Sequence, residues 1–112
     1  MKKIELVIRP SKLEELKAEL TKMGVRGMTI FDVMGRGLQG DVKQYYRGQE
    51  HLVDLFPKVK VEIVCSDQSV ENIISTVLKT CKTGKIGDGK IFVYPVERTI
   101  RISTREEGEA AL

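Results

Sequence analysis

The chain of 112 residues is poor in aromatic side chains, which make up 5% of it and include no tryptophan. Proteins that bind RNA on an open sheet stack the bases on strand aromatics, and the two segments with a central-strand pattern, "KKIELVIR" and "KVKVEIVC", contain none. The excess of positive charge is also small, with 19 Lys and Arg against 16 Asp and Glu and a net charge of +3. We therefore expect no nucleic-acid partner.

Cysteine and histidine are scarce as well. Cys65 and Cys81 are too far apart for a Cys-x-x-Cys site, and both fall in apolar patterns, which predicts two reduced thiols in the core. His51 is the single histidine, so the soft ligands of a zinc site are too few.

Long apolar runs are missing too. The first residues, "MKKIELVIRP", reach the charged Arg9 before an apolar run of signal-peptide length forms, and no window approaches the roughly 18 apolar residues of a membrane span. The length suits one domain, residues 1–112, which buries about 65% of its unfolded surface. We expect a soluble, cytoplasmic protein.

The apolar pattern repeats one plan in each half of the chain. "KKIELVIR" alternates as a strand does, residues 11–24 have helical spacing with a capping box at Ser11 and Glu14, and "MTIFDVMG" is a second strand. "KVKVEIVCS", a helix whose apolar stripe includes Leu78, and "KIFVYPVE" repeat that order. Two successive βαβ units predict a ferredoxin-like (βαβ)2 sandwich of the α+β class.

The last residues depart from this plan. "TIRIST" has the alternation of a short extra strand, whereas the tail, about 103–112, has no pattern that suggests a packing partner. We expect the tail to be mobile.

Two connections stand out because compact domains usually join their elements with about 2 to 6 residues. One is "GLQGDVKQYYRGQEHLVDLFP", residues 37–57, and a connection of this length is functional or disordered. The other is the basic, glycine-rich stretch "KTGKIGDGK", residues 82–90.

The glycine-rich stretch matches a phosphate-binding Walker A motif only in part. Gly84, Gly89 and Lys90 have its spacing, but Ile91 stands where a Ser or Thr would hold magnesium, and a strand follows in place of a helix. Glycines and lysines in such a turn can surround a polyphosphate, or can form a solvated basic turn. The residues alone leave both interpretations open.

The chain resembles the PII nitrogen-regulatory signal-transduction proteins over essentially its whole length. The resemblance lies in "GMT" at 27–29, "GRGLQG" at 35–40, "YRG" at 46–48, "VDLFPKVKVEIV" at 53–64, "TGKIGDGKIFVYPVE" at 83–97 and "IRI" at 100–102. The glycine-rich stretch, about 82–90, is similar to the family's B-loop, which wraps nucleotide phosphates. Residues of about 37–57 correspond to its T-loop, which docks on target proteins.

The resemblance implies a homotrimer whose clefts between subunits hold ATP or ADP and, with magnesium and ATP, also 2-oxoglutarate. The implied nucleotide residues are Gly27, Met28, Thr29, Gly37, Leu38, Gln39, Val64, Gly87, Asp88, Gly89, Lys90 and Arg101. Gln39, Lys58 and Gly87 are implied for 2-oxoglutarate, and Gln39 for magnesium. Without the resemblance, Lys58 would be a solvated lysine at a strand edge.

The resemblance also implies how partners are controlled. Arg47, with Tyr45 and Tyr46 beside it, matches the T-loop tip that plugs an Amt-type ammonium transporter, and no residue pattern argues for catalysis. We expect a non-enzymatic sensor of adenylate state and 2-oxoglutarate. A regulator of nitrogenase or another target, and a slow ATPase that resets the T-loop, are the alternatives.

Four positions depart from the family's pattern. His51 stands where many members carry the tyrosine that is nucleotidylylated, and Gln49 stands where others carry a phosphorylated serine, so we expect neither modification. Leu38 and Ser103 replace arginines that reach phosphates in many members, which leaves the preference between ATP and ADP open.

Overall fold

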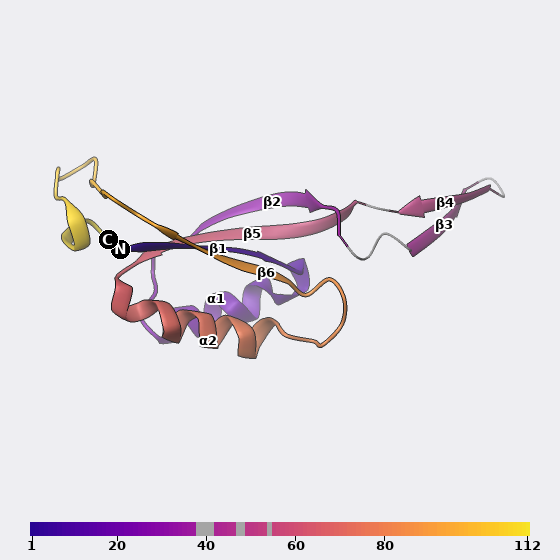
Figure 1. Ribbon diagram of the computed structural model, residues 1–112, viewed down its shortest axis with the longest axis horizontal. Coiled ribbons are helices and arrows are strands. Elements are labelled where there is room, and N and C mark those ends of the chain that lie inside the picture. Colours follow the sequence, from indigo (N-terminus) through magenta and orange to yellow (C-terminus); the bar gives the residue numbers. More distant parts are fainter. Residues whose placement is uncertain (38–41, 47–48, 54) are drawn as a thin grey trace.

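Four strands form one antiparallel sheet in the order β2-β5-β1-β6, and two helices cover one of its faces (Figure 1). The computed structural model describes residues 1–37, 42–46, 49–53 and 55–112. The strands of this sheet are β1 (Lys2–Ile8), β2 (Thr29–Gly35), β5 (Phe56–Cys65) and β6 (Gly89–Pro95), and the helices are α1 (Leu13–Lys22) and α2 (Val70–Cys81). The order and connections confirm the predicted ferredoxin-like α+β fold.

The core lies between the sheet and the helices, where the alternation of the strands meets the apolar stripes of α1 and α2. Its fully buried side chains are Ile4, Leu6, Ile8, Leu16, Leu20, Val61, Ile63 and Ile73. Cys65 and Cys81 are buried free thiols in the same cluster, as predicted. Each buried leucine or isoleucine contributes roughly 1.5–3 kcal/mol of apolar transfer, so this cluster provides the main stabilising free energy.

The register of the central strand β1 defines the two ends of the sheet. At one end, Lys2 pairs with Cys65 of β5 and with Pro95 of β6. At the other end, Ile8 pairs with Val59 and with Gly89. The connection from α2 to β6 and the ends of β2 and β5 that lead to the T-loop lie together at the Ile8 end (Figure 1).

The predicted capping box at α1 is wrong. The chain enters α1 through a 3-10 turn, Pro10–Lys12, and no side-chain hydrogen bond caps either element. Pro10 has a fixed φ and no N–H, which suits it to the first turn of a helix, so Ser11 lies inside the turn and not before it. Leu78 also differs from prediction, since its side chain in α2 is 55% exposed at the margin of the helix stripe.

The C-terminal segment does not form the short extra strand that the sequence suggested, and its last residues include a 3-10 helix. Ile100 and Glu107 form an isolated bridge, and a short 3-10 helix spans Gly108–Ala111. The backbone N–H of Arg101 donates to the carbonyl of Glu106 (2.9 Å), and that of Gly108 donates to the carbonyl of Thr99 (2.9 Å). The segment therefore folds back on itself beside the N-terminus (Figure 1).

Part of the T-loop forms a second, two-stranded sheet that the sequence patterns did not predict. Strand β3 (Val42–Tyr46) pairs antiparallel with β4 (Gln49–Val53), with Val42 opposite Val53. Val42, Tyr45 and Tyr46 of β3 and Val53 of β4 are residue types that favour strands, which is the signal that the sequence offered.

Neither helix of the described ranges has the length and apolar character that a membrane-spanning segment requires.

Candidate functional site

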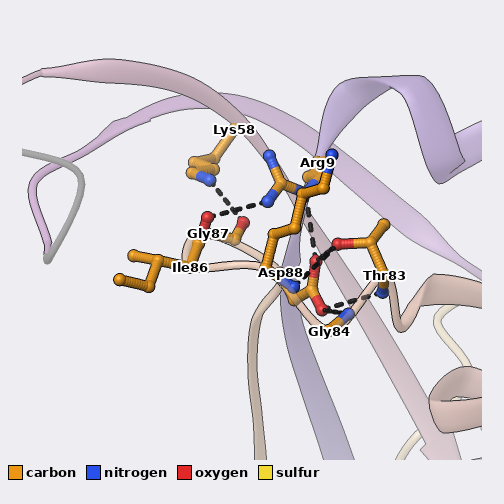
Figure 2. A network of polar contacts seen from close by, with 8 residues as sticks. Arg9, Lys58, Thr83, Gly84, Ile86, Gly87 and Asp88 are labelled. Atoms are coloured by element: carbon orange, nitrogen blue, oxygen red, sulfur yellow. Dashed lines mark hydrogen bonds and ion pairs between the residues drawn. The ribbon is translucent and has the colours of Figure 1, made fainter. Parts of the chain in front are cut away.

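The B-loop, residues 82–90, joins α2 to β6 and is organised from within by one carboxylate. Asp88 accepts hydrogen bonds from the backbone N–H groups of Thr83 (2.8 Å) and Gly84 (2.9 Å) and from the Thr83 hydroxyl (Figure 2). These bonds, those of Thr83 foremost, hold the pKa of the Asp88 carboxyl well below its usual range. Asp88 is therefore ionised at neutral pH, and its carboxylate orders the loop.

Arg9, at the end of β1, attaches the B-loop to the sheet. Its Nε donates to the Asp88 carboxylate (3.1 Å), and its Nη2 donates to the carbonyl oxygen of Ile86 (2.8 Å) (Figure 2). The guanidinium thus contacts two points of the loop at once, which fixes it better than a single contact would.

Lys58 of β5 provides a second attachment and is the best buried charged residue of the site. Its side chain is 8% exposed, and its Nζ donates to the carbonyl oxygen of Gly87 at 2.7 Å (Figure 2). Burial lowers the pKa of Lys58 below 10.5, the positive charge of Arg9 lowers it further, and the Asp88 carboxylate opposes the shift. Lys58 is thus held in the site, in contrast to the solvated lysine that its strand position alone suggested.

The B-loop, β5 and the end of β2 line a cavity of about 580 Å³ that is open to solvent. Its lining includes the cationic side chains of Arg36, Lys58, Lys85 and Lys90. Gly87 and Gly89 have φ values of 103° and 101°, which only glycine adopts readily, so the loop needs glycine at both positions. A cavity with glycine backbone on one side and several cations around it suits a polyanionic ligand.

The residues implied for ligands by the resemblance fall into two groups on the chain. One group lines the cavity and comprises Gly37, Lys58, Gly87, Asp88, Gly89 and Lys90. The other lies outside the cavity: Val64 pairs with Lys3 near the Lys2 end of the sheet, Thr29 begins β2 level with the middle of β1, Gly27 and Met28 precede Thr29, and Arg101 follows β6. Leu38, Gln39 and Arg47 lie outside the described residues, and Tyr45 and Tyr46 belong to β3.

Within one chain the B-loop and Arg101 lie toward opposite ends of the sheet. Gly89 pairs with Ile8, whereas Pro95 pairs with Lys2 at the far end of the sheet, and six residue steps along a strand span about 20 Å. The N–H of Val96 donates to the carbonyl of Met1 (3.1 Å), so the segment that follows β6 and contains Arg101 begins beside the N-terminus, whereas the B-loop lies at the other end of the sheet (Figure 1). One ligand group cannot contact both the B-loop and Arg101 of the same chain.

Two contributors to the site escaped the sequence patterns. Arg9 and Thr83 organise the B-loop through Asp88, and Arg9 is 79 residues away from Asp88 in sequence. The pairing of β1 with β6 would have pointed to Arg9. Arg9 follows Ile8, and Ile8 lies opposite Gly89, so Arg9 is placed beside the B-loop.

Asp88→Asn should lower the thermal unfolding temperature by a few degrees near neutral pH, because an amide has one acceptor oxygen in place of a carboxylate. Since the folded-state pKa of Asp88 is depressed, its stabilising effect is complete above its ordinary value of 3.8 and is lost as the pH falls through the folded value. The difference between wild type and variant should therefore shrink below about pH 4. Calorimetric scans from pH 7 to pH 3 measure this, and a difference that stays constant would contradict it.

Known proteins similar to this chain point to one family. The family model described as "Nitrogen regulatory protein P-II" matches residues 1–106. The chain is 52% identical over 112 residues to the "Nitrogen regulatory protein P-II" of Pasteurella multocida and to that of Haemophilus influenzae, with full coverage of each protein. It is 49% identical, again at full coverage, to "Nitrogen regulatory protein P-II 1" of Escherichia coli K12. The resemblance inferred from the motifs is thus confirmed, and the chain belongs to the P-II family of nitrogen regulatory proteins.

Proposed function

We propose that this chain is a non-enzymatic sensor that binds ATP or ADP in clefts between the copies of a homotrimer. The observation that carries the proposal is the B-loop cavity, in which Lys58, Lys85 and Lys90 surround a glycine-rich turn held by Asp88. Charged hydrogen bonds from such cations to phosphate oxygens are short and strong, so a nucleotide polyphosphate fits the cavity better than a neutral ligand.

The other half of the nucleotide site comes from a neighbouring copy. Met28 packs against the core at the edge of the sheet, and Val64 is 37% exposed, so both can offer apolar surface to a base. Arg101 at the same end supplies a guanidinium for a phosphate or ribose oxygen. This assignment explains why the implied residues lie at both ends of one chain and yet serve one ligand.

The 2-oxoglutarate site builds on Lys58. This ammonium is buried and bonded to the Gly87 carbonyl, so a dicarboxylate that enters the cavity offers it an ionic partner in place of a neutral one. A charged hydrogen bond of this kind contributes about 1.5–3 kcal/mol. Gln39 would hold magnesium beside the effector, which ties effector binding to the presence of ATP.

Calorimetric titration tests the proposal directly. We expect one ATP or ADP site per chain, and 2-oxoglutarate should bind only when ATP and magnesium are present. Absence of binding by both nucleotides would refute the proposed function. Release of phosphate during the titration would instead support the slow-ATPase alternative.

The proposed target is an Amt-type ammonium transporter, which the T-loop would engage through Arg47. An arginine on a loop tip has a long flexible stem and donors in several directions, as entry into a channel mouth requires. Strands β3 and β4, which precede and follow that tip in the sequence, pair with each other. ATP with 2-oxoglutarate should release the complex, because a ligand shifts an equilibrium between loop states when it binds one of them more tightly.

Arg47→Ala should weaken capture by the transporter by at least about tenfold while ATP affinity stays unchanged, because an interface arginine of this kind is worth more than about 1.4 kcal/mol. Surface plasmon resonance on the immobilised transporter measures this. Lys43→Ala, which removes another T-loop cation from β3, is the matched control. Equal capture of wild type and Arg47→Ala would exclude the plug role.

A further inference from the structure

The guanidinium of Arg101 is held by oxygens of the chain's own C-terminal segment. Its Nη1 forms an ion pair with the Glu106 carboxylate at 2.9 Å. Its Nη2 donates to the main-chain oxygens of Leu112 (3.2 Å) and, more weakly, of Ala110 (3.4 Å). Both terminal nitrogens of the guanidinium are thus engaged by the segment 106–112.

The backbone holds this arrangement in place. The N–H of Arg101 donates to the Glu106 carbonyl at 2.9 Å, and the N–H of Arg105 donates to the Arg101 carbonyl at 2.8 Å. Arg105 itself has a φ of 62°, which closes the tight turn between the two partners. The carboxylate of Glu106 is therefore presented to Arg101 by a folded turn and not by chance contact of two surface side chains.

A neighbouring ion pair provides an internal comparison. Arg98 pairs with Glu107 at 2.9 Å, on the same segment and one residue further along. Its side chains are 72% and 60% exposed, against 40% and 45% for Arg101 and Glu106. Glu106 and Glu107 thus contribute the same charge to the same segment, but each pairs with a different arginine.

A carboxylate and a phosphate compete for the same donors of an arginine, because both accept paired N–H bonds from the guanidinium fork. We propose that Glu106, with the main-chain oxygens of the segment 106–112, is a built-in competitor for Arg101 that sets the nucleotide affinity of the cleft. The inference rests on the proposed nucleotide site. A nucleotide must displace Glu106 from Arg101, so the affinity observed is the intrinsic affinity reduced by the fraction of chains in which Arg101 is released.

The exposure of the pair makes such an exchange feasible. A half-exposed ion pair is screened by water and contributes little, whereas a polyphosphate brings several charges to the same guanidinium. The competitor therefore lowers affinity without preventing binding.

Glu106→Gln should tighten ATP binding by about two- to fivefold, because a neutral amide holds the guanidinium more weakly than a carboxylate does. Glu107→Gln is the matched control: it removes the same charge one residue away, from an acid that pairs with Arg98. In the Arg101→Ala background, Glu106→Gln should have no effect, since the contested group is absent. Calorimetry with ATP on all four variants and the wild type gives the comparison.

Each outcome separates this inference from the proposed function. Tighter binding by Glu106→Gln alone, abolished in the Arg101→Ala background, supports the competitor. Binding by wild type with equal or weaker binding by Glu106→Gln overturns the competitor and leaves the nucleotide site standing, and weaker binding would make Glu106 a residue that orients Arg101 for the ligand. An equal gain in Glu106→Gln and Glu107→Gln would assign the effect to general charge and would also overturn it. Failure of the wild type to bind ATP or ADP refutes both proposals.

Discussion

Gly89→Ala should lower the free energy of unfolding by at least about 3 kcal/mol and abolish nucleotide binding, because one substitution combines backbone strain with a direct clash. Gly89 has a φ of 101°, which disfavours any residue with a Cβ. A Cβ at this position would overlap the carbonyl oxygen of Val7 and would lie 2.8 Å from its carbonyl carbon. Since Gly89 opens β6 and pairs with Ile8, relief of the clash would separate β6 from β1 just where the B-loop is attached.

Two glycine variants separate strain from clash in this experiment. Gly84→Ala adds a Cβ in the same loop at a φ of 84°, and that Cβ would meet no atom within 4 Å. Backbone strain alone should therefore lower the free energy of unfolding by about 1–2 kcal/mol. Gly27 has no positive φ, and a Cβ there would meet no atom within 4 Å, so Gly27→Ala should leave the free energy of unfolding nearly unchanged. Urea unfolding of the three variants measures their free energies of unfolding, which should fall in the order Gly27→Ala, Gly84→Ala, Gly89→Ala. Equal stabilities of Gly84→Ala and Gly89→Ala would contradict the role given to the contact between the B-loop and β1.

Lys90→Ala and Arg101→Ala should each weaken ATP binding by about tenfold to a hundredfold, because each removes a charged hydrogen bond worth about 1.5–3 kcal/mol. Lys90 lines the B-loop cavity, whereas Arg101 belongs to the segment that follows β6 at the Lys2 end of the sheet. The expectation of a similar loss from two residues so far apart follows only if a nucleotide contacts two copies of the chain.

Lys79→Ala is the control for this pair of variants. Lys79 lies in the last turn of α2, outside the cavity, so its removal changes the net charge without touching the proposed site. Calorimetric titration should return wild-type affinity for Lys79→Ala. If Lys90→Ala and Arg101→Ala both bind ATP with wild-type affinity, the proposal that the B-loop binds nucleotide phosphates is wrong.

Local patterns predicted the elements of the sheet because burial on one face imposes a period of two on a strand. Val59, Val61 and Ile63 alternate in the sequence and are all buried in β5. The same alternation in "TIRIST" misled, because among the described residues this segment forms only an isolated bridge from Ile100 to Glu107, and the chain turns back at Arg105. Period alone cannot report whether a partner strand exists.

Long-range polar contacts could not be predicted from the sequence. Arg9 and Asp88 are separated by 79 residues, and Lys58 is separated from Gly87 by 29, so no local window contains either pair. Lys58 shows the consequence most clearly: a lysine at a strand edge suggests solvent, but the folded B-loop covers it. The family resemblance named Lys58 and Asp88 for the site, whereas their roles as anchors of the loop became visible only in the fold.

The competition for Arg101 also depends on geometry that the sequence does not contain. Glu106 and Glu107 are adjacent acids, and nothing in the sequence distinguishes them. The turn at Arg105 directs Glu106 to Arg101 and Glu107 to Arg98. The tail predicted to be mobile is therefore the part of the chain that contacts a proposed ligand residue.

The central claim is that each nucleotide site joins the B-loop of one copy to the Arg101 end of another, and mixed oligomers test it most directly. Chains carrying Lys90→Ala and chains carrying Arg101→Ala, with different affinity tags, would be refolded together, and oligomers containing both would be purified. If the residues act across an interface, a mixed ring contains a cleft in which both are intact, so high-affinity ATP binding should reappear in the mixture although neither parent has it. Mixed oligomers that bind ATP as weakly as their parents would contradict the claim.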